Sequence, residues 1–333
     1  MYDVGMIAVP RIGISMGCPA GIGPEVVACG LAARPGVETI VFGDVNILER
    51  AARSAGVKLP ASASVVPVTR LSDDEVQPGA PSEVTGRAQI EYLAAAADAV
   101  LAGKVSALVT APISREWAAR AGMPFQSHME YLAHRVDANQ CATMQIGSGL
   151  RVSMVTGRVP LRQIPSLLTA AAIAQTTVLT VQALSTYFGV RLPRLAVAGL
   201  NPLAGEGGRI GDEETHLVLP AVNLAQRLLS TSGLAARVSG PHEPDTVFRQ
   251  MLVGDYDAVV ALYHDQCQIP VKLLAADEAV SLTLGLPFVR TSPDHGTAYD
   301  IAGTGRAKYQ GFLRALDLAV SLAEKSLAVP DTA

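Results

Sequence analysis

The chain has 333 residues, more than one simple hydrophobic core usually serves, so we expect two domains. Hydrophobic residues make up 49% and charged residues 17%, a balance that excludes a disordered chain and suits a well-buried α/β enzyme. The formal net charge of -4 excludes the basic excess of nucleic-acid binding proteins, so no nucleic-acid partner is expected.

The cysteines and the first residues indicate the cellular compartment. The four cysteines have no paired spacing, which indicates reduced thiols rather than disulfides or a zinc site. The opening stretch, MYDVGMIAVPRIGIS, lacks a basic flank and a long apolar core, so no signal peptide is expected. No segment is as long as a membrane span. We therefore expect a cytoplasmic protein without a membrane partner.

Strands and helices are expected to alternate along the chain, which predicts mostly parallel sheets. Apolar runs predict strands at Arg11–Ser15, Thr39–Gly43, Ser64–Val68, Ser106–Thr110, Thr143–Ile146, Arg151–Thr156, Arg194–Ala198, Ala258–Leu262 and Val280–Leu284. Helical spacing predicts helices at Pro24–Ala33, Val45–Ala55, Arg87–Leu101, Phe125–Val136, Ser166–Tyr187, Glu214–Leu229 and Tyr309–Leu327.

The first glycine-rich turn, MGCPAGIGPE, joins the strand at Arg11–Ser15 to the following helix. Its glycines permit backbone shapes that other residues resist, and Pro24 suits the first turn of a helix. Such a turn can hold phosphate at the helix N-terminus, although the pattern is not GxGxxG. A tight structural turn is the alternative interpretation.

A second glycine-rich loop, GLNPLAGEGGRIGDEE, occupies Gly199–Glu214. A loop of this length is costly to order unless it has a function. Asn201, Glu206 and the backbone amides are candidates for ligand contact. A surface loop that tolerates glycine is the alternative.

The segment after the strand at Val280–Leu284 reads GLPFVRTSPDHGTAYDIAGTGRA and is expected to be irregular. It gathers an arginine and several short polar side chains, namely Arg290, Thr291, Ser292, Asp294, His295, Thr297 and Asp300. This combination suits an anionic ligand such as a phosphate, a carboxylate or a dinucleotide.

The stretch Tyr256–Lys272, YDAVVALYHDQCQIPVK, begins as a buried parallel strand and then becomes polar at His264-Asp265-Gln266. Open α/β sheets place ligands at the carboxyl ends of their strands. Lys272 follows His264 by eight residues, beyond Pro270, so we expect this cation to return to the same cleft. A polar turn from strand to helix is the alternative.

Six segments together resemble the 4-hydroxythreonine-4-phosphate dehydrogenase family of vitamin B6 synthesis, PdxA. They are GCPAGIGPE, TAPIS at Thr110–Ser114, FQSHMEYLA at Phe125–Ala133, GLNPLAGEGGRIGDEE, YHDQ and TLGLPFVRTSPDHGTAYDIAGTGRA. They occur in the family's order and spacing across nearly the whole chain.

The resemblance implies an α/β fold with two α/β/α domains and mostly parallel sheets, similar to isocitrate and isopropylmalate dehydrogenases, with the active-site cleft between the domains. We expect residues 1–127 with 292–333 to form the first domain. Residues 128–291 would form the second, with the dimer interface and the cofactor and substrate residues. The family also implies a homodimer with active sites at the subunit interface.

The chemistry that the resemblance implies is oxidation of a secondary alcohol by NAD, usually with loss of the neighbouring carboxylate. A divalent metal held by three histidines serves that chemistry in the family. In this chain Arg158 of TGRVP and Leu203 of NPLAGE stand at two of the ligand positions, and only His264 remains. One imidazole is not a catalytic metal site, so we expect no divalent metal and Arg158 in its place.

The resemblance also implies the binding residues. For the substrate these are His128, Met129, Lys272, Ser281 and Arg290, of which Met129 and Ser281 replace a threonine and an asparagine of the family. For the cofactor they are Asn201, Glu206, Gly207, Asp294, His295 and Thr297, with a structural contact as the alternative for His295. NAD is the expected cofactor, and NADP stays open.

Three functional hypotheses follow. In the first, the chain is an oxidoreductase that acts on a small carboxylated or phosphorylated acid, such as a cyclic cis-dihydrodiol carboxylate, with or without decarboxylation. His264, oriented by Asp265, would take the hydroxyl proton, Arg158 would hold the oxyanion, and Lys272 is the alternative base. The second hypothesis is a 4-hydroxythreonine-, threonate- or erythronate-4-phosphate dehydrogenase, with the metal or with arginine in its place. The third is a catalytically inactive ligand-binding homologue.

Overall fold

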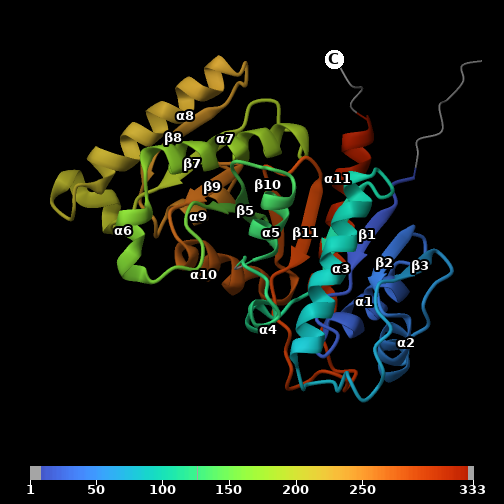
Figure 1. Ribbon diagram of the computed structural model, residues 1–333. Helices are drawn as coiled ribbons and strands as arrows, with labels where there is room; N and C mark the ends of the chain where they lie inside the picture. Colours follow the sequence, from blue (N-terminus) through green and yellow to red (C-terminus); the bar gives the residue numbers. More distant parts are fainter. Residues whose placement is uncertain (1–8, 126, 329–333) are drawn as a thin grey trace, which may run out of the picture. The chain divides into compact units, whose positions relative to one another are not determined.

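The computed structural model describes residues 9–125 and 127–328, and contacts divide the chain into two compact units (Figure 1). The first unit contains the chain up to Asp137 and from Leu286 onward, and the second contains Ala138–Gly285. Gln126 of the FQSHMEYLA motif lies outside the described residues, as does part of the stretch on which the absence of a signal peptide was judged.

These units differ in their boundaries from the domains expected from the sequence. Helix α5 (His128–Arg135) and strand β11 (Val289–Pro293) both lie in the first unit. The reason is that β11 pairs with the first unit's sheet, and His128 hydrogen-bonds to Arg290 on that strand. Three expected substrate residues, His128, Met129 and Arg290, therefore belong to the first unit.

The sheet of the first unit has the strand order β3-β2-β1-β4-β11, and its neighbouring strands are parallel. Its other strands are β1 (Ile12–Ser15), β2 (Thr39–Gly43), β3 (Ala63–Pro67) and β4 (Ala107–Thr110). From β1 the chain continues to β2 and β3 on one side, and later to β4 on the other. Such a switch point leaves a crevice at the carboxyl ends of the two central strands.

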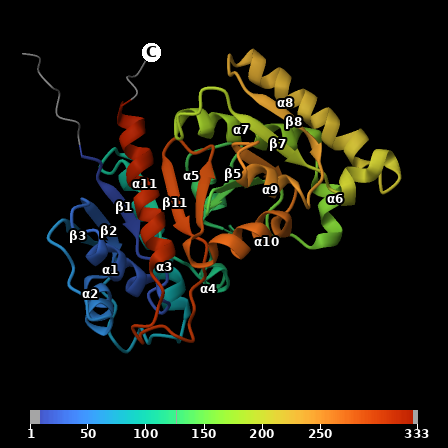
Figure 2. The ribbon, with the colours of Figure 1, turned by 180° about the vertical axis from the view of Figure 1, so that it is seen from behind.

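Helices cover both faces of this sheet. They are α1 (Gly23–Ala33), α2 (Val45–Ser54), α3 (Glu83–Leu101), α4 (Arg115–Arg120), α5 and α11 (Gln310–Ala328). Helix α3 packs on β1, β2 and β4 and lies in front of the strands in Figure 1, whereas α11 lies in front in Figure 2. Gly30 lets α1 approach α11, because a Cβ there would lie 2.5 Å from the Phe312 ring. The covered strands β1 and β4 are fully buried.

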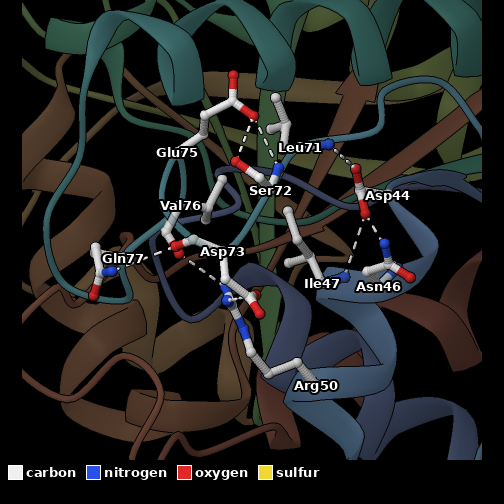
Figure 3. Close-up of polar contacts among 10 residues, drawn as sticks. All are labelled: Asp44, Asn46, Ile47, Arg50, Leu71, Ser72, Asp73, Glu75, Val76 and Gln77. Carbon is white, nitrogen blue, oxygen red and sulfur yellow. Dashed lines mark hydrogen bonds and ion pairs between the residues drawn. The ribbon is translucent and has the colours of Figure 1, made fainter.

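Helix α2 anchors the segment that follows β3 (Figure 3). Asp44 caps the helix by accepting from the amides of Asn46 and Ile47, and its other oxygen accepts from the Leu71 amide at 2.7 Å. Further along the helix, Arg50 donates to the Val76 carbonyl and pairs with an aspartate of the same segment. The N-cap residue of α2 and one side chain within the helix thus fix a stretch that has little secondary structure of its own.

The sheet of the second unit is mixed, with the strand order β10-β5-β6-β9-β7-β8. The β10–β5 and β5–β6 pairs are antiparallel, and the other pairs are parallel. The strands are β5 (Ala142–Gly147), β6 (Leu150–Met154), β7 (Arg194–Ala198), β8 (Arg237–His242), β9 (Ala258–Ala261) and β10 (Val280–Leu284). The α-helices are α6 (Ile164–Leu167), α7 (Ala170–Thr186), α8 (Leu219–Thr231), α9 (Val247–Leu252) and α10 (His264–Ala275).

Strand β9 shows how this sheet builds two cores. Ala258 and Val260 pack in one hydrophobic cluster with residues of α7 and α8, whereas Val259 and Ala261 pack in another with residues of α9 and α10. Successive side chains of a strand point to opposite faces, so a strand covered on both faces must be apolar throughout. The expected buried strand before His264 is thereby confirmed.

Several predicted elements were wrong. The single helix expected at Ser166–Tyr187 is two, α6 and α7, because Leu168 is extended and Thr169 caps α7 by accepting from the Ala172 amide. The helix expected from Glu214 opens with a π-helical turn before α8. Strand β8 and helix α9 were not predicted, and β11 lies in the segment that was expected to be irregular.

No single helix within residues 9–125 and 127–328 is long and apolar enough to cross a membrane. The segments Leu161–Leu167 and Ala170–Thr186 reach that length only when taken together, and they meet at a bend of 89°.

Candidate active site

The carboxyl ends of β6 and β9 bring Arg158 and His264 into one cleft of the second unit. Beyond the strands, the Thr156 amide and hydroxyl both donate to the Leu262 carbonyl, the hydroxyl at 2.8 Å. These two hydrogen bonds keep the residues that follow β6 and β9 together. Arg158 follows two residues after Thr156, and His264 follows two residues after Leu262, so the side chains converge.

The cleft has a volume of about 350 Å³. Its lining consists of Arg158, Val159, Leu161, Ile164, Tyr263, His264 and Asp265. His264 Nδ1 lies 2.7 Å from Asp265 Oδ1, and the two side chains are 29% and 69% exposed. A guanidinium and a carboxylate-oriented imidazole therefore face solvent across apolar walls, an arrangement that suits oxyanion stabilisation and proton transfer.

Gln266 has a structural task, unlike its two polar neighbours. Its amide oxygen accepts from the Leu262 amide at 2.7 Å, and its amide nitrogen donates to the Gly199 carbonyl at 2.8 Å. The side chain is buried and ties the end of β9 to the start of the long glycine-rich loop. Of the polar triplet, only His264 and Asp265 reach the cleft.

The glycine-rich loop Gly199–Glu214 is fixed by the buried carboxylate of Glu214. That carboxylate accepts from the Leu200 and Asn201 amides at 2.8 and 2.7 Å, and the Asn201 side chain donates to it at 3.0 Å. Leu203 to Gly208 all have positive φ, including non-glycine residues at 45° to 53°. Such strain persists only where the surroundings hold it. Asn201 is thus engaged within the loop, whereas Glu206 and Gly207 are exposed.

The donor set of the cleft does not fit the divalent metal that the family resemblance implies. Within the described residues, no three His, Cys, Asp or Glu side chains are grouped so that they could hold a metal ion. Leu203, at one of the family's ligand positions, is 47% exposed and has no donor atom in its side chain. Arg158 brings a positive charge, which repels a cation.

Two expected site residues lie elsewhere in the second unit. Lys272 does not line the cleft, because His264 to Ala275 form one helix and eight residues rise about 12 Å along its axis. The expectation that Lys272 returns to the same cleft was therefore wrong. Ser281 is buried on β10, where its hydroxyl accepts from the Gln145 side chain at 2.7 Å.

In the first unit, Arg290 on β11 forms a buried cluster with Thr110 and His128. Its Nε donates to the Thr110 hydroxyl at 3.1 Å, and its Nη2 lies 3.0 Å from His128 Nδ1. Burial lowers the pKa of Arg290 to about 10, so the guanidinium is charged at neutral pH. Burial, and secondly the Arg290 charge, lower the pKa of His128 well below its usual value.

The His128 tautomer follows from this contact. A guanidinium only donates, so Nδ1 accepts and the ring proton lies on Nε2. His128 Nε2 is buried and has no hydrogen-bond partner among the described residues. A buried donor next to a buried cation is the chemistry that an anionic ligand group needs.

The crevice at the switch point of the first sheet gathers three loops. The Cys18 amide donates to the Pro112 carbonyl, so the turns after β1 and β4 meet. The Tyr299 hydroxyl lies 3.4 Å from Cys18 Sγ, and burial raises its pKa. Thr297 belongs with Asp294 and His295 to the loop that leaves the carboxyl end of β11. The expected cofactor residues of this unit thus follow the end of β11, the strand next to β4.

Some residues of these two sites were not singled out from the sequence. Thr110 supports Arg290, Tyr263 lines the cleft and Tyr299 joins the loops of the crevice. For Thr110 a signal existed: it is the last residue of a buried strand and the first of TAPIS, whose other residues form a turn. Tyr299 has no local signal, because its partner Cys18 is distant in sequence.

Solved structures show which class of protein has this fold. A 4-hydroxythreonine-4-phosphate dehydrogenase from Klebsiella pneumoniae matches with a TM-score of 0.82 and 36% identity, over 94% of this chain and 99% of that one. A terephthalate 1,2-cis-dihydrodiol dehydrogenase from Burkholderia xenovorans LB400 matches with 0.65 and 30%, over 94% and 98%. The EutD phosphotransacetylase from Staphylococcus aureus, at 16% identity and a TM-score of 0.58, shares the fold alone.

The chain belongs to the PdxA family. Residues 36–319 match the family described as pyridoxal phosphate biosynthetic protein PdxA. A curated relative, the 4-hydroxythreonine-4-phosphate dehydrogenase of Desulfosudis oleivorans, is 45% identical over 332 residues, which cover 94% of this chain and 96% of the relative. The resemblance drawn from the six sequence segments is thereby confirmed at the level of the family.

Proposed function

We propose that this chain is an NAD-dependent dehydrogenase that oxidises the secondary alcohol of a small phosphorylated or carboxylated substrate without a divalent metal. The observation that carries the proposal is the shared cleft of Arg158 and His264 at the carboxyl ends of β6 and β9. The relatives support the class of reaction, because they are named 4-hydroxythreonine-4-phosphate dehydrogenases.

The substrate's anionic group binds to Arg290 and His128 in this proposal. Arg290 supplies charge and several donors in a plane, a geometry that matches phosphate and carboxylate oxygens. His128 Nε2 adds a neutral donor. We also assign Met129, in the first turn of α5, and Ser281, which stands where the family has an asparagine, to the remainder of the substrate.

The reacting end of the substrate is assigned to the cleft of the second unit. His264, held by Asp265, takes the proton from the substrate hydroxyl. The hydride leaves the carbon that bears this hydroxyl, so the alcohol becomes a ketone. Arg158 donates to the oxygen as negative charge develops on it. If the carbon next to the new ketone carries a carboxylate, the product is a β-keto acid. The bond from that carbon to the carboxylate then breaks, carbon dioxide leaves, and the electron pair forms an enolate whose oxygen faces Arg158.

NAD supplies the hydride acceptor when it is bound. The crevice of the first sheet suits a dinucleotide, because ligands of open α/β sheets bind at the switch point. The backbone approaches closely there, since a Cβ on Gly21 would lie 2.9 Å from the Thr297 carbonyl oxygen. We assign Asp294, His295 and Thr297 to the cofactor, together with Asn201, Glu206 and Gly207 of the long loop.

We also propose that the protein is a cytoplasmic homodimer whose active sites lie at the subunit interface. Ile269, Lys272 and Leu273 share one face of α10, and the two apolar side chains are 66% and 81% exposed. An exposed apolar stripe of this kind suits burial against a second copy. Lys272 would then serve as the second cation for the substrate from that interface.

A 4-hydroxythreonine-4-phosphate dehydrogenase that binds a metal is the second candidate, favoured by the 45% identical relative of that name. The test is NADH formation by chelator-treated protein, with and without added zinc. The substrate panel contains 4-hydroxythreonine-4-phosphate, threonate- and erythronate-4-phosphate, and a cyclic cis-dihydrodiol carboxylate. We expect turnover of one member without metal.

Each other outcome selects an alternative. Turnover only after zinc is added would overturn the metal-independent proposal and favour the second candidate. NAD binding without turnover of any member would favour a ligand-binding homologue that has lost catalysis.

A further inference from the structure

Glu25 is a buried carboxylate that the reaction proposed above does not use. It lies in the first turn of α1, within the GCPAGIGPE segment, and is 2% exposed. Its Oε1 accepts from the Gly305 amide at 2.8 Å, across 280 positions of sequence. Its Oε2 is buried without a hydrogen-bond partner in the described part of the chain. A cavity of about 50 Å³ borders the side chain.

This placement is energetically unfavourable for a purely structural residue. Burial raises the pKa of Glu25 although the Gly305 and Gly303 amides oppose that shift. Desolvating a carboxylate while leaving one oxygen without a donor costs stability, and an apolar or amide side chain would pack there at lower cost. Violations of the packing rules concentrate where a protein has a function to perform.

The partner of Glu25 is the loop that carries three of the assigned cofactor residues. This loop runs from Asp294 at the end of β11 to Arg306. The Ile22 amide, beside the start of α1, donates to the Thr297 carbonyl at 2.9 Å. Ala298, the next residue, has a φ of 40°, a strained value for a residue other than glycine. The loop must therefore be held from outside to keep its shape.

A third segment closes around the same loop. The Gly79 amide donates to the Ala20 carbonyl at 2.8 Å, and a Cβ on Gly79 would lie 2.8 Å from the Tyr299 carbonyl oxygen. A Cβ on Gly303 would lie 2.6 Å from Pro78. The residues before Pro78 are those that Arg50 and Asp44 anchor to α2 (Figure 3). The loop thus lies against two fixed segments, and Glu25 supplies a hydrogen-bond acceptor at its far end.

We propose that Glu25 is a positioning residue for the cofactor: by holding the Gly303–Gly305 backbone, it fixes the loop that presents Asp294, His295 and Thr297. The inference rests on the proposed function, because it takes that loop as the cofactor site. Glu25 itself is buried behind the loop and touches neither substrate nor NAD.

The test compares NAD binding and kinetics of Glu25→Ala, Glu25→Gln and the full-length wild-type protein. Loss of a charged hydrogen bond should weaken NAD binding in Glu25→Ala about tenfold. KM for NAD should rise by the same factor, while kcat at saturating NAD stays unchanged. Glu25→Gln keeps one acceptor oxygen and should show a smaller rise. The matched control is Thr39→Val, a 2% exposed residue at the start of β2, away from the loop.

The outcomes separate this inference from the proposed function. If wild-type protein does not bind NAD in calorimetry, the proposed function fails. If the wild type binds NAD and a folded Glu25→Ala binds it equally tightly, Glu25 does not position the loop. Should Glu25→Ala not fold, a folded Glu25→Gln decides, and unchanged KM for NAD in that variant overturns the inference. A fall in kcat with unchanged NAD affinity also overturns it.

Discussion

The two units hold their charged site residues in different ways. In the first unit, Arg290 is 5% exposed and donates to Thr110 and His128, so protein groups fix its position before any ligand arrives. In the second unit, Arg158 is exposed, and His264 shows 29% of its side chain to solvent. One arginine is built into a core, and the other borders an open cleft.

This contrast assigns different tasks to the two arginines. A donor held rigidly by its neighbours binds a ligand group with little loss of entropy, which favours affinity. A donor that faces solvent gains most when charge develops on a bound oxygen, which favours rate. We therefore expect substitutions in the first unit to raise KM and substitutions in the cleft to lower kcat.

The largest effect is expected for Arg290→Lys. Lysine keeps the charge but lacks the planar donors, so at least one charged hydrogen bond to the substrate is lost and Thr110 loses its partner. We expect kcat/KM for the acidic substrate to fall about a hundredfold, mainly through KM, as measured by initial rates of NADH formation. The matched control is Arg34→Lys, because Arg34 forms a surface ion pair with Asp317 in the same unit. An unchanged KM would show that the buried cation does not bind the substrate.

Arg158→Ala should act on the rate instead. Removing a donor to the developing oxyanion costs about a hundredfold in kcat, with a much smaller change in KM. Arg162→Ala, four residues further along the same exposed segment, controls for loss of surface charge. If Arg158→Ala raised KM and left kcat unchanged, Arg158 would be a binding residue like Arg290, and the division of tasks between the units would be wrong.

The parts of the fold that the sequence predicts are those with a simple period. The runs Ile40–Phe42 and Ala258–Ala261 are apolar throughout, and they lie in the strands β2 and β9. Strand β11 was missed because Arg290 and its polar neighbours do not look like a buried strand, although β11 pairs with β4 and all five of its residues are buried. Strand β8 contains Gly240-Pro241, which the sequence signals as a break rather than a strand.

The candidate site was predictable to a similar extent. The position of His264 after the end of a buried strand predicted that it would reach a cleft. The family pattern pointed to Arg158. Both residues line one cavity. Lys272 was misplaced because the sequence does not show that α10 continues through Pro270, which carries Lys272 along the helix and away from the cleft. The contact between Glu25 and Gly305 has no local signal, since it depends on how segments at opposite ends of the chain pack.

The buried histidine of the first unit makes stability depend on pH. The folded-state pKa of His128 is lowered, so the unfolded state takes up a proton first and stability falls as pH falls through about 6.5. At pH 5 this penalty reaches about 2 kcal/mol, and His128→Gln should not suffer it. Denaturant unfolding at pH 8 and pH 5 measures the difference, with His134→Gln on the exposed face of α5 as control. Equal losses in wild type and His128→Gln would contradict the buried neutral imidazole.

The smallest effect is expected at the amino ends of β7 and β9, the opposite edge from the cleft. Asp257 accepts hydrogen bonds from the Arg194 amide and guanidinium. Burial raises the pKa of Asp257, but these hydrogen bonds outweigh burial, so the net shift of the pKa is downward. Asp257→Asn should therefore cost about 1 kcal/mol at neutral pH, or about 3 °C in Tm. The difference should shrink as pH falls below the usual aspartate pKa and vanish below the lowered folded-state pKa, since the stabilising charge is then lost in the wild type too. The exposed neighbour Asp255 provides the control variant, Asp255→Asn.

Because this edge of the sheet carries no site residue, kcat and KM of Asp257→Asn should not change. A change in either would mean that the cleft depends on the far edge of its sheet.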